Sequence, residues 1–464
     1  MMAKTVFRED NMKFLTLEEH RARIENINRA EIVNRRYFRR HRIREYLPGQ
    51  AVYNLGDYPA RFSIEPTEYD YNMLKDMAAN GVELIQIHEE WNDPVRRFGA
   101  DKYSCFDPKG LEHFIDLAHL FGIKIIPYIS SGFFHELDPD FDEKFTVRKN
   151  YCLAGMHFKY RRCSAGSAEW REYLLPRTVA VLDRYNFDGI FNDMGYDSSH
   201  RVKPGGCDKK YGLDEYDPEI EDLLGLIYHE VKSRGGIYKI HRSRNNPAPC
   251  KDKVYDYIWI GEAVKDSKIG TGKNFYDYVV PCPDKKQFKY ADPETLYAST
   301  IPFMQFPLMT SRGRPLMGKR VEEDIPYYHH EDGSIGIEYT FNKKIGEFMR
   351  EHPNGPYTYS LWSAIPDDVE DYPRWCKYLA LYRPMVEANS LAYIELRECD
   401  DILSPIPDEI YASMFVNEKT YLVVSNFTES EYELKLKEKW SDRVSGEVSD
   451  TFKIGYGKIL FLIK

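Results

Sequence analysis

The chain has 464 residues, of which 42% are hydrophobic and 14% aromatic, and its formal net charge is −10 at pH 7. This composition is typical of a globular protein, and the length exceeds that of one average domain. Residues 1–48 hold twelve Lys or Arg and seven acids, a charge of +5, so the remainder carries −15 and should not attract nucleic acid.

The first expected element is a long basic helix. Thr16 and Glu19 form a capping-box pattern, and neither Pro nor Gly interrupts the chain from there to Pro48. Six arginines lie between residues 35 and 44. We favour a solvated or packed face for them over contact with nucleic acid or a membrane. Residues 1–48 are thus predicted to form a helical arm, a candidate surface for homo-oligomer contacts.

From residue 51, short apolar runs alternate with helical patterns. Helices begin at caps such as Asp107 with Pro108 and end at glycines such as Gly122. The expected strands are residues 51–55, 83–88, 123–129, 190–193, 237–241, 255–260, 301–306 and 357–362. Eight strands, each followed by a helix, predict a (β/α)8 barrel over residues 49–390. An open doubly wound sheet is the alternative, but no glycine-rich phosphate loop opens any helix.

The C-terminal part of the chain shows a different pattern. Residues 309–354, between expected strands seven and eight, form a long insertion of the kind that serves as a lid or a partner surface. A last barrel helix is expected at 373–388, and short alternating runs joined by turn residues follow it. Residues 391–464 are therefore predicted to form a small antiparallel β-sandwich.

Cysteines, histidines and apolar runs give little sign of metal or membrane. The eight cysteines show no Cys-x-x-Cys pair and no dense spacing. Adjacent residues such as His329 and His330 point in opposite directions in an extended chain, so we predict no metal, and no cofactor. No run approaches the roughly 18 apolar residues of a membrane span, and the N-terminus has no apolar signal core. We expect a cytoplasmic protein without membrane contact.

Polar and aromatic residues gather at the ends of the expected strands, which meet at one mouth in a parallel barrel. Asp193 ends strand four and is the leading catalytic candidate; its alternative is a helix cap or a partner of a barrel arginine. Glu262 follows strand six and is the second candidate, with pairing to Arg242 or Lys265 equally open. The candidates for substrate contact are His88, Glu89, Trp91, Tyr128, Asn192, His241, Arg242 and Trp362.

This mixture of residues suits glycoside hydrolysis. One carboxylate attacks or stabilises the anomeric carbon, a second group protonates the leaving oxygen, and aromatic rings with polar rims hold the sugar. The two carboxyl groups lie about 5–5.5 Å apart in retaining enzymes and about 6.5–9.5 Å apart in inverting ones. Residues 193 and 262 are the pair that this chemistry predicts.

At these residues the sequence resembles the clan of retaining glycoside hydrolases that contains α-galactosidases and isomaltosidases, with α-glucosidases as distant relatives. The segment Asp188-Gly-Ile-Phe-Asn-Asp193 is similar to the clan's strand-four pattern, which implies that Asp193 is the nucleophile. His88-Glu89-Glu90-Trp91 stands where the clan has Asp-Asp-x-Trp, which implies a grip on sugar hydroxyls. The clan's acid comes from strand six, which implies this role for Glu262 in place of the usual aspartate.

The resemblance covers residues 50–464. It implies an exo-acting, α-galactosidase-like enzyme that cleaves terminal α-linked sugars from oligosaccharides or glycosides by double displacement. The altered acids leave the identity of the sugar open. A carbohydrate-binding barrel without hydrolysis and a transglycosylase or lyase with the same carboxylates are the alternatives.

Overall fold

The computed structural model divides the chain into two compact units. One unit consists of Met1–Tyr46 and Pro384–Lys464, and the other of Leu47–Arg383. The domain limits at residues 48 and 390 stay predictions. The structure describes residues 18, 21, 25–26, 36–43, 46–55, 63–88, 91, 103–105, 107–135, 140–146, 160–193, 218–242, 250, 252–260, 279–281, 293–314, 327–329, 335–337, 371–386 and 391–464.

The unit Leu47–Arg383 is built on one parallel sheet, whose strands lie in the order β10-β9-β8-β7-β4-β3-β2-β11. The strands are β2 (Gln50–Asn54), β3 (Leu84–Ile87), β4 (Lys124–Ser130), β7 (Gly189–Asp193), β8 (Ile237–Arg242), β9 (Tyr257–Ile260), β10 (Val279–Pro281) and β11 (Met309–Gly313). The amide of Leu308, just before β11, donates to the carbonyl of Pro281 in β10 at 2.8 Å, which brings the two outer strands together. The predicted (β/α)8 barrel is confirmed.

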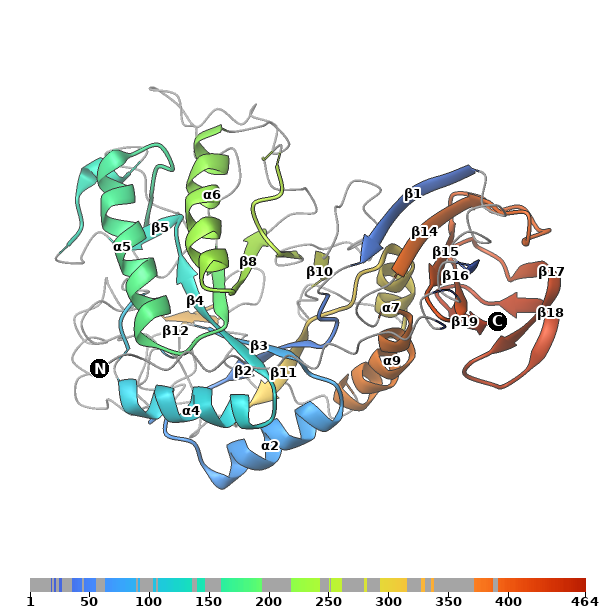
Figure 1. Ribbon diagram of the computed structural model, residues 1–464, viewed down its shortest axis with the longest axis horizontal. Helices are drawn as coiled ribbons and strands as arrows, with labels where there is room; N and C mark the ends of the chain where they lie inside the picture. Colours follow the sequence, from blue (N-terminus) through green and yellow to red (C-terminus); the bar gives the residue numbers. More distant parts are fainter. Residues whose placement is uncertain are drawn as a thin grey trace. The chain divides into compact units, whose positions relative to one another are not determined.

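Helices cover the outside of this sheet (Figure 1). The helices are α2 (Glu68–Ala79), α4 (Pro108–Leu120), α5 (Ala168–Arg184), α6 (Pro218–Ser233), α7 (Thr295–Thr300) and α9 (Asp371–Val386), with 3-10 turns η2 (Glu143–Phe145) and η4 (Ile301–Phe303). The Asp107 side chain caps α4 by accepting from the Gly110 amide, and Ser167 caps α5 in the same way. Apolar residues at helical spacing on α6 are buried, as expected for a helix with one apolar face.

The prediction for strand seven is wrong. Residues 301–306 form η4 and a turn at Met304, which adopts a left-handed backbone with φ 56°. Pro302 lacks an N–H for a strand ladder, and a short buried apolar run does not distinguish strand from helix. In the described part of the chain, the seventh and eighth strands of the sheet are β10 and β11, and β11 lies within the expected insertion at 309–354. Residues 357–362 lie outside the described part of the chain.

The other unit contains an antiparallel sheet in the order β1-β14-β15-β16-β19-β17-β18. Its strands are β1 (Arg36–Ile43), β14 (Leu391–Glu398), β15 (Ile410–Val416), β16 (Thr420–Asn426), β17 (Tyr432–Asp442), β18 (Val448–Ile454) and β19 (Ile459–Ile463). Alternate residues of these strands, such as Ile410, Met414 and Leu422, form one apolar core. The sequence predicted an antiparallel β-sandwich at the C-terminus; an antiparallel sheet there is confirmed, with β1 added to it.

The predicted N-terminal helix is wrong over Arg36–Ile43, which is strand β1. β1 pairs antiparallel with β14 although more than 340 residues separate them, and the two lie side by side in Figure 1. A run that holds Tyr, Phe and Ile fits a strand, and backbone pairing with β14 overrides the helical pattern. The Asn26 side chain also donates to the carbonyls of Asn417 and Glu418 at the β15–β16 turn. An oligomer contact through this arm stays a prediction.

Two short antiparallel pairs complete the described strands. β5 (Phe133–His135) pairs with β6 (Tyr160–Arg162) in the segment between β4 and α5, and β12 (Tyr327–His329) pairs with β13 (Ile335–Ile337). Phe134 packs on Phe145 of η2 and on Trp170 of α5, which fixes the first pair to the barrel. Every helix in the described ranges is too short or too polar to cross a membrane.

Candidate active site

Asp193 is the last residue of β7, at the carboxyl end of the barrel strands. At the start of β7, the backbone of Gly189 lies against β8. Gly189 has φ 144°, and a Cβ on it would lie 1.9 Å from the carbonyl oxygen of Ile237. Only glycine tolerates both that backbone conformation and that approach. β7 pairs with β4 on one side and β8 on the other, so these two strands supply side chains around the Asp193 carboxylate.

Both oxygens of the Asp193 carboxylate accept a hydrogen bond. The Tyr128 hydroxyl, from β4, donates to Oδ2 at 2.6 Å, and Nδ1 of His241, from β8, forms a short hydrogen bond with Oδ1. The Asp193 side chain keeps 17% of its surface exposed, whereas that of His241 keeps 1%. The carboxylate is thus held from two sides and remains reachable from solvent.

Four rings form a layer beside this carboxylate. His88 follows β3 and stacks on Phe191 of β7 with ring centres 5.6 Å apart, and Phe191 lies 4.9 Å from Trp259 of β9. Trp259 stacks in turn on His241 at 4.5 Å with an interplanar angle of 30°. In (β/α)8 barrels the inward-facing residues of alternate strands form layers, and β3, β7 and β9, which lead to His88 and carry Phe191 and Trp259, are alternate strands of the sheet. His88, Tyr128, Asp193 and His241 therefore come together as the sequence predicted.

The charge state of Asp193 follows from these contacts. Burial acts to raise the pKa of Asp193, but the charge and hydrogen bond of His241, with the hydrogen bond from Tyr128, hold the pKa below its ordinary value. Hydrogen bonds to a carboxylate favour its ionised form. Asp193 is accordingly an anion at neutral pH.

His88 is a neutral imidazole. Burial has the largest effect on the pKa of His88, Asp193 opposes it, and His241 and Lys239 add to it, so that the pKa is lowered to about 3. The side-chain amide of Gln86 donates to Nε2 of His88 at 2.9 Å, as it can only when that nitrogen is unprotonated. The residue that follows β3 is therefore an uncharged ring.

Asn192 does not share the face of Asp193. It is fully buried, its Oδ1 accepts from the Ser131 amide at 3.0 Å, and its amide donates to the hydroxyls of Ser131 and Tyr238. Successive residues of a strand point to opposite sides, so this orientation follows from that of Asp193. The structure gives Asn192 the role of tying the end of β7 to the segment after β4 and to β8.

Trp91 does not line the site either. It is fully buried, its indole N–H donates to the carbonyl of Tyr128 at 3.0 Å, and its ring meets Tyr185 and Phe187 edge-on. A tryptophan without exposed surface cannot stack on a bound sugar. Trp91 instead packs behind β4.

Three predicted site residues, Glu89, Glu262 and Trp362, lie outside the described residues. Arg242 is the last residue of β8, where the structure describes its backbone alone. The place of Trp362 at the end of a barrel strand stays a prediction. The residue that the prediction missed is Trp259, which alternation along β9 places on the inner side of the barrel beside His241.

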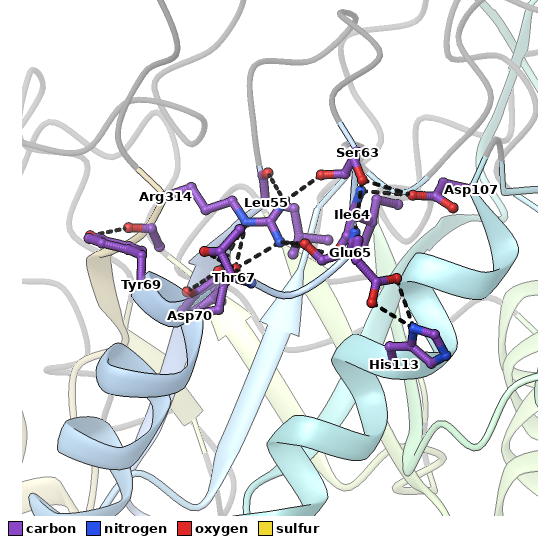
Figure 2. Close-up of polar contacts among 12 residues, drawn as sticks. Leu55, Ser63, Ile64, Glu65, Thr67, Tyr69, Asp70, Asp107, His113 and Arg314 are labelled. Atoms are coloured by element: carbon purple, nitrogen blue, oxygen red, sulfur yellow. Dashed lines mark hydrogen bonds and ion pairs between the residues drawn. The ribbon is translucent and has the colours of Figure 1, made fainter.

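A second carboxylate lies at the carboxyl ends of β2 and β11 (Figure 2). Asp70, on α2, accepts from Nε and Nη2 of Arg314, each at 2.9 Å, from the Tyr53 hydroxyl and from the Thr67 amide. The remaining guanidinium hydrogens of Arg314 go to backbone carbonyls of Leu55 and of residues 63–65. Asp70 is fully buried and Arg314 nearly so, and this pair holds the segment that leads into α2.

The described residues contain no group of three or more His, Cys, Asp or Glu placed to hold a metal ion. The site consists of the Asp193 carboxylate, the Tyr128 phenol and the imidazoles of His88 and His241. The His241 imidazole is bonded to Asp193 itself. Such a set can present one fixed anion and polar hydrogen-bonding groups to a neutral, hydroxylated ligand.

No protein-family model matches this sequence, and no curated protein sequence matches it significantly. Solved structures share its fold. The α-glucosyl transfer enzyme XgtA aligns with a TM-score of 0.56 and 12% identity over 90% of this chain and 99% of that one. The trehalose-6-phosphate hydrolase of Bacillus licheniformis aligns with a TM-score of 0.54 and 11% identity, over 90% and 99% respectively.

A maltogenic α-amylase of Thermotoga neapolitana, AmyB, is also similar, with a TM-score of 0.52 and 10% identity over 89% of this chain and 98% of that chain. At such identities the likeness establishes the fold alone. The chain thus has the (β/α)8 barrel and C-terminal β-sheet seen in these glycoside-processing enzymes.

Proposed function

We propose that the chain is a retaining glycoside hydrolase that removes terminal α-linked sugars from oligosaccharides or glycosides. The observation that supports this best is the Asp193 carboxylate, which ends a barrel strand, stays ionised and keeps an exposed surface. A nucleophile must be both anionic and reachable. The fold shared with an amylase and a trehalose-6-phosphate hydrolase adds to this support.

The proposed reaction is a double displacement. Asp193 attacks the anomeric carbon, so a glycosyl ester forms while the glycosidic bond breaks and its oxygen takes a proton from Glu262. Glu262, now a carboxylate, removes a proton from water, which attacks the ester and releases the sugar with its original anomeric configuration. The assignment of Glu262 rests on the strand-six resemblance. No cofactor is required.

The sugar pocket is proposed to use the strand ends around Asp193. His88, as a neutral imidazole, and the Tyr128 hydroxyl are suited to hydrogen-bond sugar hydroxyls. Glu89 and Arg242 stay candidates for the same role, and Trp362 is a candidate ring for sugar stacking. Trp91 and Asn192 are proposed to support the wall of the site, since both are fully buried.

The proposed class is α-galactosidase-like with the identity of the sugar left open, and we keep the cytoplasm as the proposed location. The test is release of nitrophenol from a panel of aryl α-glycosides and β-glycosides, with Asp193→Asn as the paired variant. Hydrolysis of an α-glycoside that disappears in the variant supports the proposal. Hydrolysis at an undiminished rate in the variant removes Asp193 from the mechanism.

A transglycosylase is the second candidate, and the fold likeness to an α-glucosyl transfer enzyme favours it. In that reaction a sugar hydroxyl takes the place of water in the second step, with the same carboxylates. NMR analysis of products in the presence of a free disaccharide separates the two: a longer oligosaccharide indicates transfer, and free monosaccharide indicates hydrolysis. A third outcome, binding of a sugar by calorimetry without any product, indicates a binding protein.

A further inference from the structure

His241 has contacts on two sides that do not involve substrate. One side of its ring lies on Trp259 with centres 4.5 Å apart, and its Nδ1 bonds to Oδ1 of Asp193. The side chain is 1% exposed. A sugar bound against Asp193 therefore has almost no surface of His241 to touch, although the sequence suggested direct contact with substrate.

The hydrogen bond fixes one feature of the imidazole. An ionised carboxylate can only accept, so the proton of this bond belongs to Nδ1 of His241, which donates it. The Tyr128 hydroxyl donates to the other oxygen, Oδ2. The plane of the Asp193 carboxylate is consequently determined by two donors on different strands, β4 and β8.

We propose that His241 is a positioning residue for Asp193: its Nδ1–H fixes one carboxylate oxygen, and the ring of Trp259 fixes the plane of the imidazole. This inference rests on the proposed function and deepens it. A nucleophile gains rate from being held within a narrow range of approach angles. Trp259 lies on β9, three residues before Glu262, so the stack also links the nucleophile to the strand that leads to the proposed acid.

His241 also contributes to the charge state of Asp193. Among the described residues, the titratable groups with the largest effects on the pKa of Asp193 are His241 on β8, Tyr128 on β4 and His88 after β3. His88 is neutral over the working range, and Tyr128 acts through its hydrogen bond. Removing the His241 donor must therefore move the titration of Asp193 toward higher pH.

The first test compares His241→Asn with His241→Leu. The two residues branch alike, but Asn can place an N–H close to the position of Nδ1 and Leu cannot. We expect kcat/KM of His241→Leu to fall about 10- to 100-fold, mainly in kcat, and the acid limb of its pH profile to shift upward. His241→Asn keeps a donor but not the charge of His241, so its acid limb should lie between those of the wild type and His241→Leu, and its kcat/KM should fall less than about tenfold.

Equal losses in the two variants with an unchanged acid limb would overturn the proposal, because a merely structural role does not move that limb. Should His241→Leu fail to fold, Trp259→Phe and Trp259→Leu make the same comparison, since Phe keeps an aromatic ring under the imidazole. Trp259→Leu should then lower kcat more than Trp259→Phe does. Equal kcat in these two variants counts against the proposal.

The second test needs no activity and so separates this inference from the proposed function. Protein labelled with ¹³C at aspartate carboxyls is titrated by NMR, and the Asp193 signal is the one missing from Asp193→Asn. The proposal predicts a higher titration midpoint for Asp193 in His241→Leu than in the wild type and in His241→Asn. Identical midpoints in all three proteins refute it. A chain that hydrolyses no glycoside but shows this shift would refute the proposed function alone.

Discussion

Asp193 and Asp70 are two carboxylates of the same barrel unit. Their surroundings suit Asp193 to a catalytic role and Asp70 to a structural one. Asp70 is fully buried and surrounded by donors, including the guanidinium of Arg314 (Figure 2). Asp193 has two donors, Tyr128 and His241, and keeps 17% of its side chain exposed. Both have a lowered pKa, so ionisation alone does not mark a site.

The contacts explain why the two carboxylates have different uses. Burial works against ionisation of Asp70, and Arg314, Tyr53 and Thr67 reverse that effect by hydrogen bonds and charge. Both oxygens of Asp70 already accept hydrogen bonds, so neither is available to a ligand. Loss of one partner of such a buried pair leaves the other charge buried without compensation. Asp193 lacks a guanidinium partner among the described residues, and its lone pairs on the exposed side can reach a substrate.

The largest expected effect comes from Asp193→Asn. An amide cannot form the glycosyl ester, so kcat/KM should fall by at least about 10³-fold, or about 4 kcal/mol in the barrier. The fold should survive, since an asparagine accepts the same Tyr128 hydrogen bond. Steady-state rates with an aryl α-glycoside and circular dichroism on the same preparation measure both quantities.

Asp188→Asn is the matched control for that variant. Asp188 lies at the other end of the same segment, where it accepts from the Ile125 amide at 2.8 Å and bonds to His119. Its substitution should lower the free energy of unfolding by about 1–3 kcal/mol while the folded enzyme keeps its rate within about tenfold. Equal loss of rate in both variants contradicts the assignment of Asp193.

Asp70→Asn should give the largest change in stability. It leaves the buried guanidinium of Arg314 without its charge partner, which costs about 3–5 kcal/mol. Urea unfolding measures the loss, and the double variant Asp70→Asn with Arg314→Met should recover part of it because no buried charge is left behind. A stability within 1 kcal/mol of wild type (roughly the worth of an exposed pair) for the single variant contradicts the structural role.

Tyr128→Phe tests the other donor to Asp193. Loss of one hydrogen bond to a charged group costs about 1.5–3 kcal/mol, so kcat/KM should fall about 10- to 100-fold. The folded pKa of Asp193 then rises, and the acid limb of the profile moves upward with it. A profile that keeps its acid limb shows that Tyr128 does not act on Asp193 in solution.

His88→Gln sharpens the comparison by way of pH. The folded pKa of His88 is about 3, whereas an unfolded histidine titrates near 6.5, so between these values the unfolded chain binds more protons. Stability therefore rises with pH in this window, by up to about 1.4 kcal/mol per unit. Glutamine does not titrate, so in the variant the free energy of unfolding should rise less steeply with pH, by up to that amount per unit. Urea unfolding at pH 4, 5 and 6 decides it; equal slopes contradict a neutral buried His88.

The sequence predicted the barrel and the place of Asp193 because both depend on local patterns. An apolar run that ends in an acid fixes where β7 stops, and helical spacing marks α4 and α6. β10 has three residues and β11 is Met-Thr-Ser-Arg-Gly, so neither carries a periodic signal. β11 and β1 are defined by pairing with β2 and β14, which are distant in sequence.

The sequence also did not show in which direction a side chain points once its strand has ended. Trp91 follows β3 by four residues, and whether it enters the mouth or packs behind β4 depends on tertiary contacts with Tyr185 and Phe187. Asn192 could have been assigned correctly, since alternation places it opposite Asp193. Trp259 likewise follows from its register with His241.

Trapping of the glycosyl intermediate tests the central claim most directly. The enzyme is incubated with a fluorinated α-glycosyl fluoride of the preferred sugar, digested, and analysed by mass spectrometry. The account predicts one added fluoroglycosyl group on the peptide that contains Asp193, and none in Asp193→Asn. An adduct on another carboxylate, or turnover that inverts the anomeric centre without any adduct, would contradict it.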